Sequence, residues 1–211
     1  ALEVSDAFTL AAARKKMGAE VFPEGDGHLI VEIDGRPSAV QLELKELEIL
    51  LKQCGAGEIR VARDEAECEA IWQLRREFSY SLRDTGLTKL NEDIVVPRGK
   101  LVELVNFARA LETETGISIA CFGHAGDGNI HTNLMVDDYT NPTTKARADD
   151  ALDKLFNWVL DQGGAITGEH GVGLAKKRWI KKALGETSFD VHRAIKKTLD
   201  PNGILNPGKI F

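Results

Sequence analysis

The stretch "ISIACFGHAGDGNIHTNLMVD", residues 117–137, restricts the fold of this chain more than any other segment. Two apolar runs rich in strand-forming residues flank a glycine-rich turn, and Asp127-Gly128 is a dipeptide favoured in tight hairpins. We therefore expect an antiparallel pair of strands here. Asp127 and Asn129 are expected to serve the turn, because short polar side chains of this kind bond their own backbone.

Helix and strand patterns alternate along the rest of the chain. Helix patterns with capping residues or glycine stops occur at 5–18, 37–55, 64–82, 99–116 and 143–164, and strand patterns at 27–35, 58–62 and 92–97. Two further helices and an irregular tail are expected in the last sixty residues. Ser5 and Asp64 are the expected helix N-caps, and a core stripe is expected at Val40, Leu44, Leu47 and Leu51. This order predicts an α+β domain, an antiparallel or mixed sheet with helices on one face, in a ferredoxin-like arrangement.

Composition excludes several classes of function. The chain has 211 residues, 43% of them hydrophobic and 28% charged, with a net charge of -6. These values are ordinary for a globular protein, and without a basic run or stripe a nucleic-acid partner is not expected. No apolar run approaches the roughly 18 residues of a membrane span, so no transmembrane segment is expected. The start lacks an initiator Met and the features of a signal peptide, which suggests a piece of a longer protein.

The cysteine spacing and the glycine-rich loops indicate what redox compartment and cofactors to expect. Three cysteines at spacings that match no zinc knuckle or redox pair favour a reduced compartment, and Cys121 is expected in the core. No glycine-rich phosphate loop of the dinucleotide or nucleotide type stands between a strand and a helix. The chain therefore shows no phosphate cradle of its own.

Three of the five histidines lie in glycine-rich surroundings. His124 and His131 flank the hairpin turn, and His170 follows Glu169 in "GEHGVG". Neutral imidazoles are common metal ligands, and a catalytic zinc usually takes three protein ligands with one position open. Glu169 or His170 could supply the third ligand. The alternative is that hairpin histidines are surface polar residues, which is the ordinary role of a lone histidine; His28 and His192 are expected to be structural.

Other polar residues suit substrate binding. Asn133 follows His131 by two positions, so both side chains of a strand would share one face, where an amide could orient a substrate or a cofactor ring. Arg75 and Ser79 are four apart on one helical face, and Lys89 follows in the next loop. An arginine fork binds carboxylates through two parallel hydrogen bonds. The alternative for Arg75 is a solvated helix charge.

The motifs "GHAGDGNIHTNL", "GEHGVGLAKKRWI" and "LDPNGILNPGKIF", together with "KLNEDIVVPRGKL", carry a resemblance to a known family. The sequence resembles the C-terminal domain of FAD-linked oxidases of the vanillyl-alcohol oxidase type. Within that family it resembles the FAD-linked glycolate oxidases, the D-lactate dehydrogenases and D-2-hydroxyglutarate dehydrogenase. The resemblance spans essentially the whole chain.

The resemblance implies a fold, cofactors and roles for residues. Residues 1–211 would form the C-terminal cap domain, an antiparallel sheet flanked by helices, while a separate N-terminal domain, absent from this chain, holds most of the FAD. The resemblance implies a divalent metal, zinc or manganese, on His124, His131 and Glu169. It implies that His170 is the base. It implies that Arg75 and Ser79 hold the substrate carboxylate, with Lys89 beside them; Asn133, from its position on the strand, is expected to bind the substrate as well. It implies that the tail returns to the flavin, with contacts from Asn206 and Lys209.

The implied partners are a small 2-hydroxy acid and an electron acceptor, either a protein or a quinone; a homodimer is left open. The expected location is the cytoplasm or the periphery of the inner membrane. A second hypothesis is a stand-alone metal-binding or metallohydrolase-like domain that uses the same two histidines and glutamate with water. A third is a structural domain whose site has decayed, and the intact set of His124, His131, Glu169 and His170 argues against it.

Overall fold

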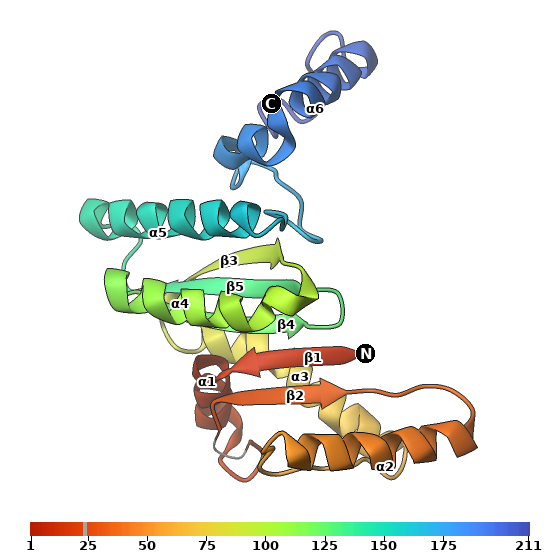
Figure 1. Ribbon diagram of the computed structural model, residues 1–211. Helices are drawn as coiled ribbons and strands as arrows, with labels where there is room; N and C mark the ends of the chain where they lie inside the picture. Colours follow the sequence, from red (N-terminus) through yellow and green to blue (C-terminus); the bar gives the residue numbers. More distant parts are fainter. Residues whose placement is uncertain (23–24) are drawn as a thin grey trace.

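The computed structural model describes residues 1–22 and 25–211, which form one five-stranded sheet with helices packed around it (Figure 1). The strand order is β2-β1-β4-β5-β3. The strands are β1 (Leu2–Asp6), β2 (Gly27–Val31), β3 (Thr88–Val95), β4 (Ser118–His124) and β5 (Asn129–Val136). The helices are α1 (Ala7–Met17), α2 (Pro37–Gln53), α3 (Glu65–Arg83), the 3-10 turn η1 (Arg98–Lys100), α4 (Leu101–Thr115), α5 (Pro142–Asp161) and α6 (Lys177–Leu199).

All four strand pairings in the described residues are antiparallel, which confirms the predicted α+β class. The predicted hairpin is the β4–β5 pair, in which His131 lies opposite Phe122. In its turn the Asn129 N–H donates to Asp127 Oδ1 at 2.9 Å, as expected. Gly128 has a φ of 84°, and a Cβ there would lie 2.0 Å from the Val96 carbonyl oxygen, so only glycine fits this turn.

Helices cover both faces of the sheet, so the prediction of helices on one face is wrong. Alternate residues of a strand point to opposite faces, and β4 carries apolar side chains on both. Ile119 and Cys121 pack with α4 and α5 in the larger core. Ala120 and Phe122 pack with α1 and α3 in the smaller one. Each apolar face requires its own cover, because exposed apolar surface is unfavourable in water.

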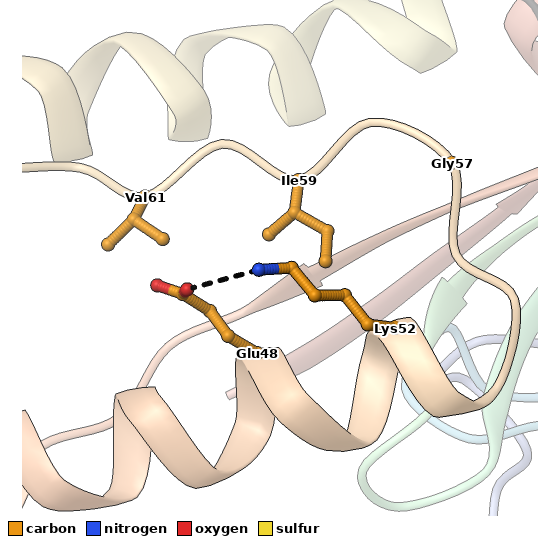
Figure 2. Close-up of a pocket in the computed structure, with 5 residues that line it drawn as sticks. All are labelled: Glu48, Lys52, Gly57, Ile59 and Val61. Carbon is orange, nitrogen blue, oxygen red and sulfur yellow. Dashed lines mark ion pairs between the residues drawn. The ribbon is translucent and has the colours of Figure 1, made fainter.

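Two predictions in the N-terminal third need correction. Ser5 does not cap a helix, because it belongs to β1 and lies opposite Phe122 of β4. Asp6 caps α1 instead, and its Oδ1 accepts from the Thr9 N–H at 2.9 Å. The segment 58–62 is not a strand, because local alternation without a partner strand leaves its backbone hydrogen bonds unmade. It runs beside α2 instead (Figure 2).

The helix ends are largely as predicted. Asp64 caps α3 by accepting from the Glu67 N–H at 2.9 Å, and Gly116 ends α4 in the left-handed conformation. A break at Gly185 divides α6 into two helical pieces, which agrees with the two helices expected there. The stripe on α2 is not core: no residue of that helix is fully buried, because α2 lies beyond β2 at the margin of the sheet (Figure 1). Its stripe is only partly buried, at Val40, Leu44, Leu47 and Leu51.

Candidate functional site

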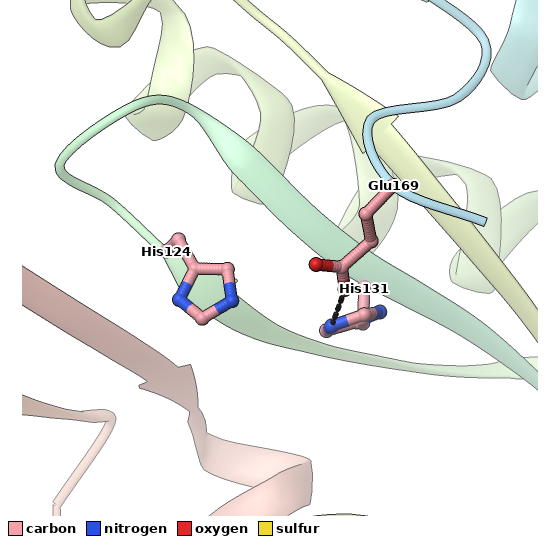
Figure 3. Close-up of side chains that lie close together, drawn as sticks. All are labelled: His124, His131 and Glu169. Atoms are coloured by element: carbon pink, nitrogen blue, oxygen red, sulfur yellow. Dashed lines mark ion pairs between the residues drawn. The ribbon is translucent and has the colours of Figure 1, made fainter. Parts of the chain in front are cut away.

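The hairpin brings two of the predicted histidines together on the α1/α3 face of the sheet. His124 ends β4 and His131 is the third residue of β5, and the pairing of the two strands sets their ring centroids 6.3 Å apart. Glu169 reaches the pair from the loop after α5, with its Oε1 3.2 Å from His131 Nε2 (Figure 3). One ligand atom from each residue lies within 4.8 Å of the other two. The structure thus assembles the predicted His124, His131 and Glu169, which we call the ligand cluster.

His170 lies beside the ligand cluster. Its ring centroid is 5.3 Å from that of His131, and its Nε2 is 3.7 Å from Glu169 Oε1. Its side chain is 43% exposed, so the imidazole remains open to solvent or to a bound molecule. This arrangement leaves His170 next to the cluster without making it a fourth member.

Burial sets the charge of His131. Burial lowers the pKa of His131 to about 4, and the nearby Glu169 carboxylate opposes this shift only in part. His131 is therefore neutral near pH 7, and the neutral imidazole is the form that binds a metal ion.

Glu3 is a site residue that the sequence reasoning missed. Its side chain is almost fully buried, its Oε1 lies 2.5 Å from His124 Nδ1, and its Oε2 accepts from Arg75 Nε at 2.6 Å. A hydrogen bond from Nδ1 to a carboxylate fixes the tautomer of a histidine and frees Nε2 for a metal. The sequence around Glu3 gave no signal of this role, because its pairing with β4 joins segments far apart in the chain.

The predicted basic residues surround one aromatic ring beside the ligand cluster. The guanidinium carbon of Arg75 lies 5.0 Å from the Phe122 ring centroid, and Lys89 Nζ lies 5.9 Å from it. Lys89 also donates to Ser79 Oγ at 2.8 Å. Phe122 in turn lies 5.2 Å from the His131 ring. Burial, followed by the charge of Arg83, lowers the pKa of Lys89.

Asn133 is fully buried on the same face. Its Nδ2 donates to the carbonyl oxygens of Ala120 and His131, each at 3.0 Å. Within the part of the chain that the structure describes, its Oδ1 has no hydrogen-bond partner. Such an oxygen could accept a hydrogen bond from a bound molecule, since a buried acceptor left unpaired is unfavourable.

The structure does not place Asn206 and Lys209 with the ligand cluster. Both are exposed in the C-terminal tail beside α6 (Figure 1), where the Lys209 N–H donates to the Asn206 carbonyl oxygen at 3.2 Å. The tail returns to the glycine-rich loop that carries Glu169, because the Ile210 N–H donates to the Gly173 carbonyl oxygen at 2.9 Å. A cofactor contact of these two residues stays a prediction.

The remaining residues singled out in the sequence have structural surroundings. Cys121 is buried, as expected, and burial raises the pKa of its thiol. His28 packs edge-on against Phe22 and Phe78, and His192 Nδ1 lies 2.7 Å from the Ser188 carbonyl oxygen. In the described residues, no helix has the length and apolar content needed to cross a membrane.

Two surface hollows lie away from the ligand cluster. One is lined by Glu48, Lys52, Gly57, Ile59 and Val61 between α2 and the following loop (Figure 2). Its two charged groups, Lys52 and Glu48, pair with each other, with Lys52 Nζ 4.0 Å from the Glu48 carboxylate. The other is lined largely by acidic side chains around Trp72, which disfavours an anionic ligand. The ligand cluster and its basic neighbours remain the better candidate site.

Comparison with known proteins matches the chain to relatives along most of its length. It is 34% identical over 183 residues to Glycolate oxidase subunit GlcD of Bacillus subtilis (strain 168), covering 87% of this chain and 39% of that protein. It is 32% identical over 220 residues to D-lactate dehydrogenase of Anaerostipes hadrus, covering 100% of this chain and 46% of that protein. The chain thus spans less than half the length of these curated relatives.

Solved structures share the fold. A structure of p-cresol methylhydroxylase with substrate bound matches with a TM-score of 0.70 at 18% identity, over 99% of this chain and 46% of that one. A 4-ethylphenol oxidase from Gulosibacter chungangensis matches with a TM-score of 0.63 at 16% identity, over 99% and 47%. Residues 1–210 match the family model described as FAD linked oxidases, C-terminal domain. With this match over nearly its whole length, the chain belongs to the family of FAD-linked oxidase C-terminal domains.

Proposed function

We propose that this chain is the substrate-side domain of an FAD-dependent oxidoreductase that converts a 2-hydroxy acid, such as glycolate or D-lactate, to the 2-oxo acid. The names of the relatives support this reaction class. The observation that carries the proposal is the juxtaposition of the ligand cluster, His170 and the basic side chains around Phe122 on one face of the sheet. Family membership favours this function over a stand-alone metallohydrolase.

The proposal assigns most of the FAD to a separate domain that precedes this one in the complete protein. The relatives are more than twice as long as the part of them that this chain matches, which leaves room for such a domain. The tail residues Asn206 and Lys209 are proposed to contact the flavin. Electrons would pass to an acceptor protein or a quinone, in the cytoplasm or at the inner membrane surface, and a homodimer would be compatible with this role.

The ligand cluster fits a divalent metal. It offers two imidazole nitrogens and one carboxylate oxygen within 4.8 Å of one another, and His131 is neutral near pH 7. Mixed imidazole and carboxylate ligation suits zinc and manganese. His124, His131 and Glu169 would hold the ion, which when bound would supply polarisation of the substrate hydroxyl and carboxylate oxygens.

The other residues have distinct roles in the proposal. His170 would accept the hydroxyl proton of the substrate, and the flavin, when bound, would supply the acceptor for the α-hydrogen. Arg75 uses Nε for Glu3, and its terminal nitrogens carry further donors for a substrate carboxylate. Lys89 and Ser79 extend the same polar wall. Asn133 Oδ1 is an unpartnered acceptor that would orient the substrate or the flavin ring.

A kinetic comparison in the complete FAD-loaded enzyme tests the substrate role of Arg75. Turnover of glycolate and D-lactate is measured with a dye as electron acceptor. Arg75→Lys should lower kcat/KM by at least about tenfold, because an ammonium cannot make the two parallel hydrogen bonds of a guanidinium. Arg76→Lys is the matched control, since Arg76 is the next residue of α3 and pairs with Glu69 on the exposed side. Equal values for the two variants would contradict the role of Arg75, and no turnover of any 2-hydroxy acid would contradict the proposed function.

A second experiment tests where the flavin is held. We expect the isolated 211-residue chain not to retain FAD, because no phosphate-binding loop stands between a strand and a helix. Flavin absorbance is recorded after purification and after titration with FAD. Tight binding of one FAD per chain would contradict the division of the cofactor proposed here.

A further inference from the structure

The loop that carries Glu169 and His170 lies along the open edge of β3. The Val95 N–H donates to the Ala165 carbonyl oxygen and the Ala165 N–H donates back, each at 2.9 Å. The Gly168 N–H donates to the Asp93 carbonyl oxygen at 2.9 Å. This short pairing covers the edge strand and brings residues 165–168 next to Asp93.

The Asp93 side chain then closes the loop around itself. Asp93 is 0% exposed, and its Oδ2 accepts from the N–H groups of Gly168 at 2.9 Å, Glu169 at 2.7 Å and His170 at 2.7 Å. Thr167 Oγ1 lies 3.0 Å from the same oxygen. Consecutive backbone N–H groups that converge on one oxygen form an anion-binding concavity, and here the anion belongs to the protein itself.

The second oxygen of Asp93 lies close to a lysine and a histidine side chain. Oδ1 accepts from Lys176 Nζ, and the Lys176 side chain is only 4% exposed. His170 Nδ1 lies 3.4 Å from Oδ1. Burial by itself would raise the pKa of Asp93, but the His170 N–H and the Lys176 ammonium outweigh it and hold that pKa well below its usual range. The loop N–H groups and the Lys176 ammonium thus stabilise the charged form of Asp93.

We propose that Asp93 is a positioning residue of the site, which fixes the 167–171 loop on β3 so that Glu169 faces His131 and His170 lies beside them. This inference rests on the proposed function. It assigns to Asp93 a role that needs no contact with metal, substrate or flavin. The loop also packs closely against the β4–β5 hairpin, because a Cβ on Gly168 would lie 2.6 Å from the Asn129 side chain.

The geometry predicts which substitution is informative. Asparagine has the size of aspartate but carries a donor in place of one acceptor. In either orientation its amide NH₂ group would face donors, either the backbone N–H groups of residues 168–170 or the Lys176 ammonium. Asp93→Asn should therefore release the loop without leaving a cavity.

Glu92 offers a matched control one residue earlier. It is also a buried carboxylate on β3, and its Oε2 lies 3.5 Å from the same Lys176 Nζ. It points to the opposite face of the sheet and makes no hydrogen bond to the loop backbone among the contacts of the described residues. Glu92→Gln should thus perturb the same buried lysine without touching Glu169 or His170.

Two measurements on the 211-residue chain test the proposal at a temperature where each variant is folded. Amide hydrogen exchange, followed by NMR, reports whether the Glu169 and His170 N–H groups remain bonded. In Asp93→Asn both amides should exchange at least about tenfold faster than in the parent, whereas in Glu92→Gln they should change by less than about twofold. Calorimetric titration with Zn²⁺, and separately with Mn²⁺, should show affinity at least about tenfold weaker in Asp93→Asn, the range found for residues that orient metal ligands.

The outcomes separate this inference from the proposed function. If the parent binds neither ion, the metal assignment fails, and the exchange rates of Glu169 and His170 still decide whether Asp93 holds the loop. Unchanged exchange in Asp93→Asn, or equal loss of metal affinity in Asp93→Asn and Glu92→Gln, would overturn the inference. Should Asp93→Asn fail to fold, Thr167→Val removes a single donor to the same carboxylate and should shift both measurements in the same direction by less.

Discussion

The two faces of the sheet differ in what they bury. The face under α4 and α5 is largely apolar, with Ile94, Ile130 and Leu134 packed in the larger core, although it also buries Glu92 and Thr132. The opposite face is apolar only where α1 and α3 cover it, and beyond them it carries Glu3, Asp93 and the ligand cluster. Because strand side chains alternate, Ile130 and His131 are chain neighbours that serve different faces. The first face therefore holds the larger apolar core, while the second combines a smaller core with a cluster of polar side chains, whose burial is unfavourable unless they are paired.

The largest expected effect is a loss of stability from a substitution on the face under α4 and α5. Leu134→Ala removes a side chain that is fully buried against α4 and α5, and should lower the free energy of unfolding by about 3 kcal/mol. The affinity for the metal should change by less than about twofold. Denaturant unfolding and calorimetry measure the two quantities. Weakened metal binding at constant fold would show that the faces are more strongly coupled than we propose.

The hairpin turn should affect both faces. Gly128→Ala forces a side chain into a backbone with φ of 84° and against the Val96 carbonyl oxygen, so we expect a loss of at least about 2 kcal/mol in the free energy of unfolding. Gly57→Ala is the control, because nothing lies within 4 Å of a Cβ there and its change should stay within about 0.5 kcal/mol. Similar unfolding curves for the two variants would contradict the strain assigned to the turn.

A smaller effect concerns the polar face alone. Glu3→Gln should weaken metal affinity by about tenfold, because the amide no longer holds both His124 Nδ1 and Arg75 Nε as a carboxylate does. Glu58→Gln, at an exposed pair with Arg60, should leave the affinity unchanged. If Glu3→Gln binds the ion as tightly as the parent, Glu3 does not orient His124.

The smallest expected effect is a pH dependence of the unfolding free energy that arises from His28. Burial against Phe22 and Phe78, followed by the charge of Arg60, lowers the pKa of His28 below its ordinary value of 6.5. The unfolded chain then binds more protons than the folded one, so this contribution is present above pH 6.5 and is lost as the pH falls below it. Unfolding of the parent and His28→Gln between pH 7.5 and 5 should show a steeper decline in the parent. Parallel curves would remove His28 from the pH response.

Local patterns in the sequence predicted much of the fold. The hairpin and the helix ends at Asp64 and Gly116 are confirmed, because each depends on residues close together in the chain. The α+β class is confirmed as well, since it follows from the alternation of helix and strand patterns. The errors at Ser5 and at 58–62 concern strand pairing, which joins distant segments and leaves no local mark. The partial exposure of the apolar stripe on α2 could not be predicted either. Periodicity shows which residues share a helix face and not how deeply that face is buried.

The site was predictable to a similar extent and for similar reasons. Glycine-rich motifs pointed to His124, His131, Glu169 and His170, which the structure brings together. Glu3 and Asp93 were missed because a buried carboxylate in a strand looks like any surface acid until its partners, 72 and more residues away, are placed beside it. Residues that orient the site thus emerge only from the tertiary structure.

The central claim is that the polar face binds one divalent ion through the ligand cluster, and metal stoichiometry tests it most directly. The chain is loaded with Zn²⁺ or Mn²⁺, freed of excess ion and analysed for metal, alongside His131→Ala and His170→Ala. We predict one ion per chain in the parent and in His170→Ala, and none in His131→Ala, because His131 belongs to the ligand cluster and His170 lies beside it. A parent without metal, or His131→Ala with as much metal as the parent, would contradict the claim.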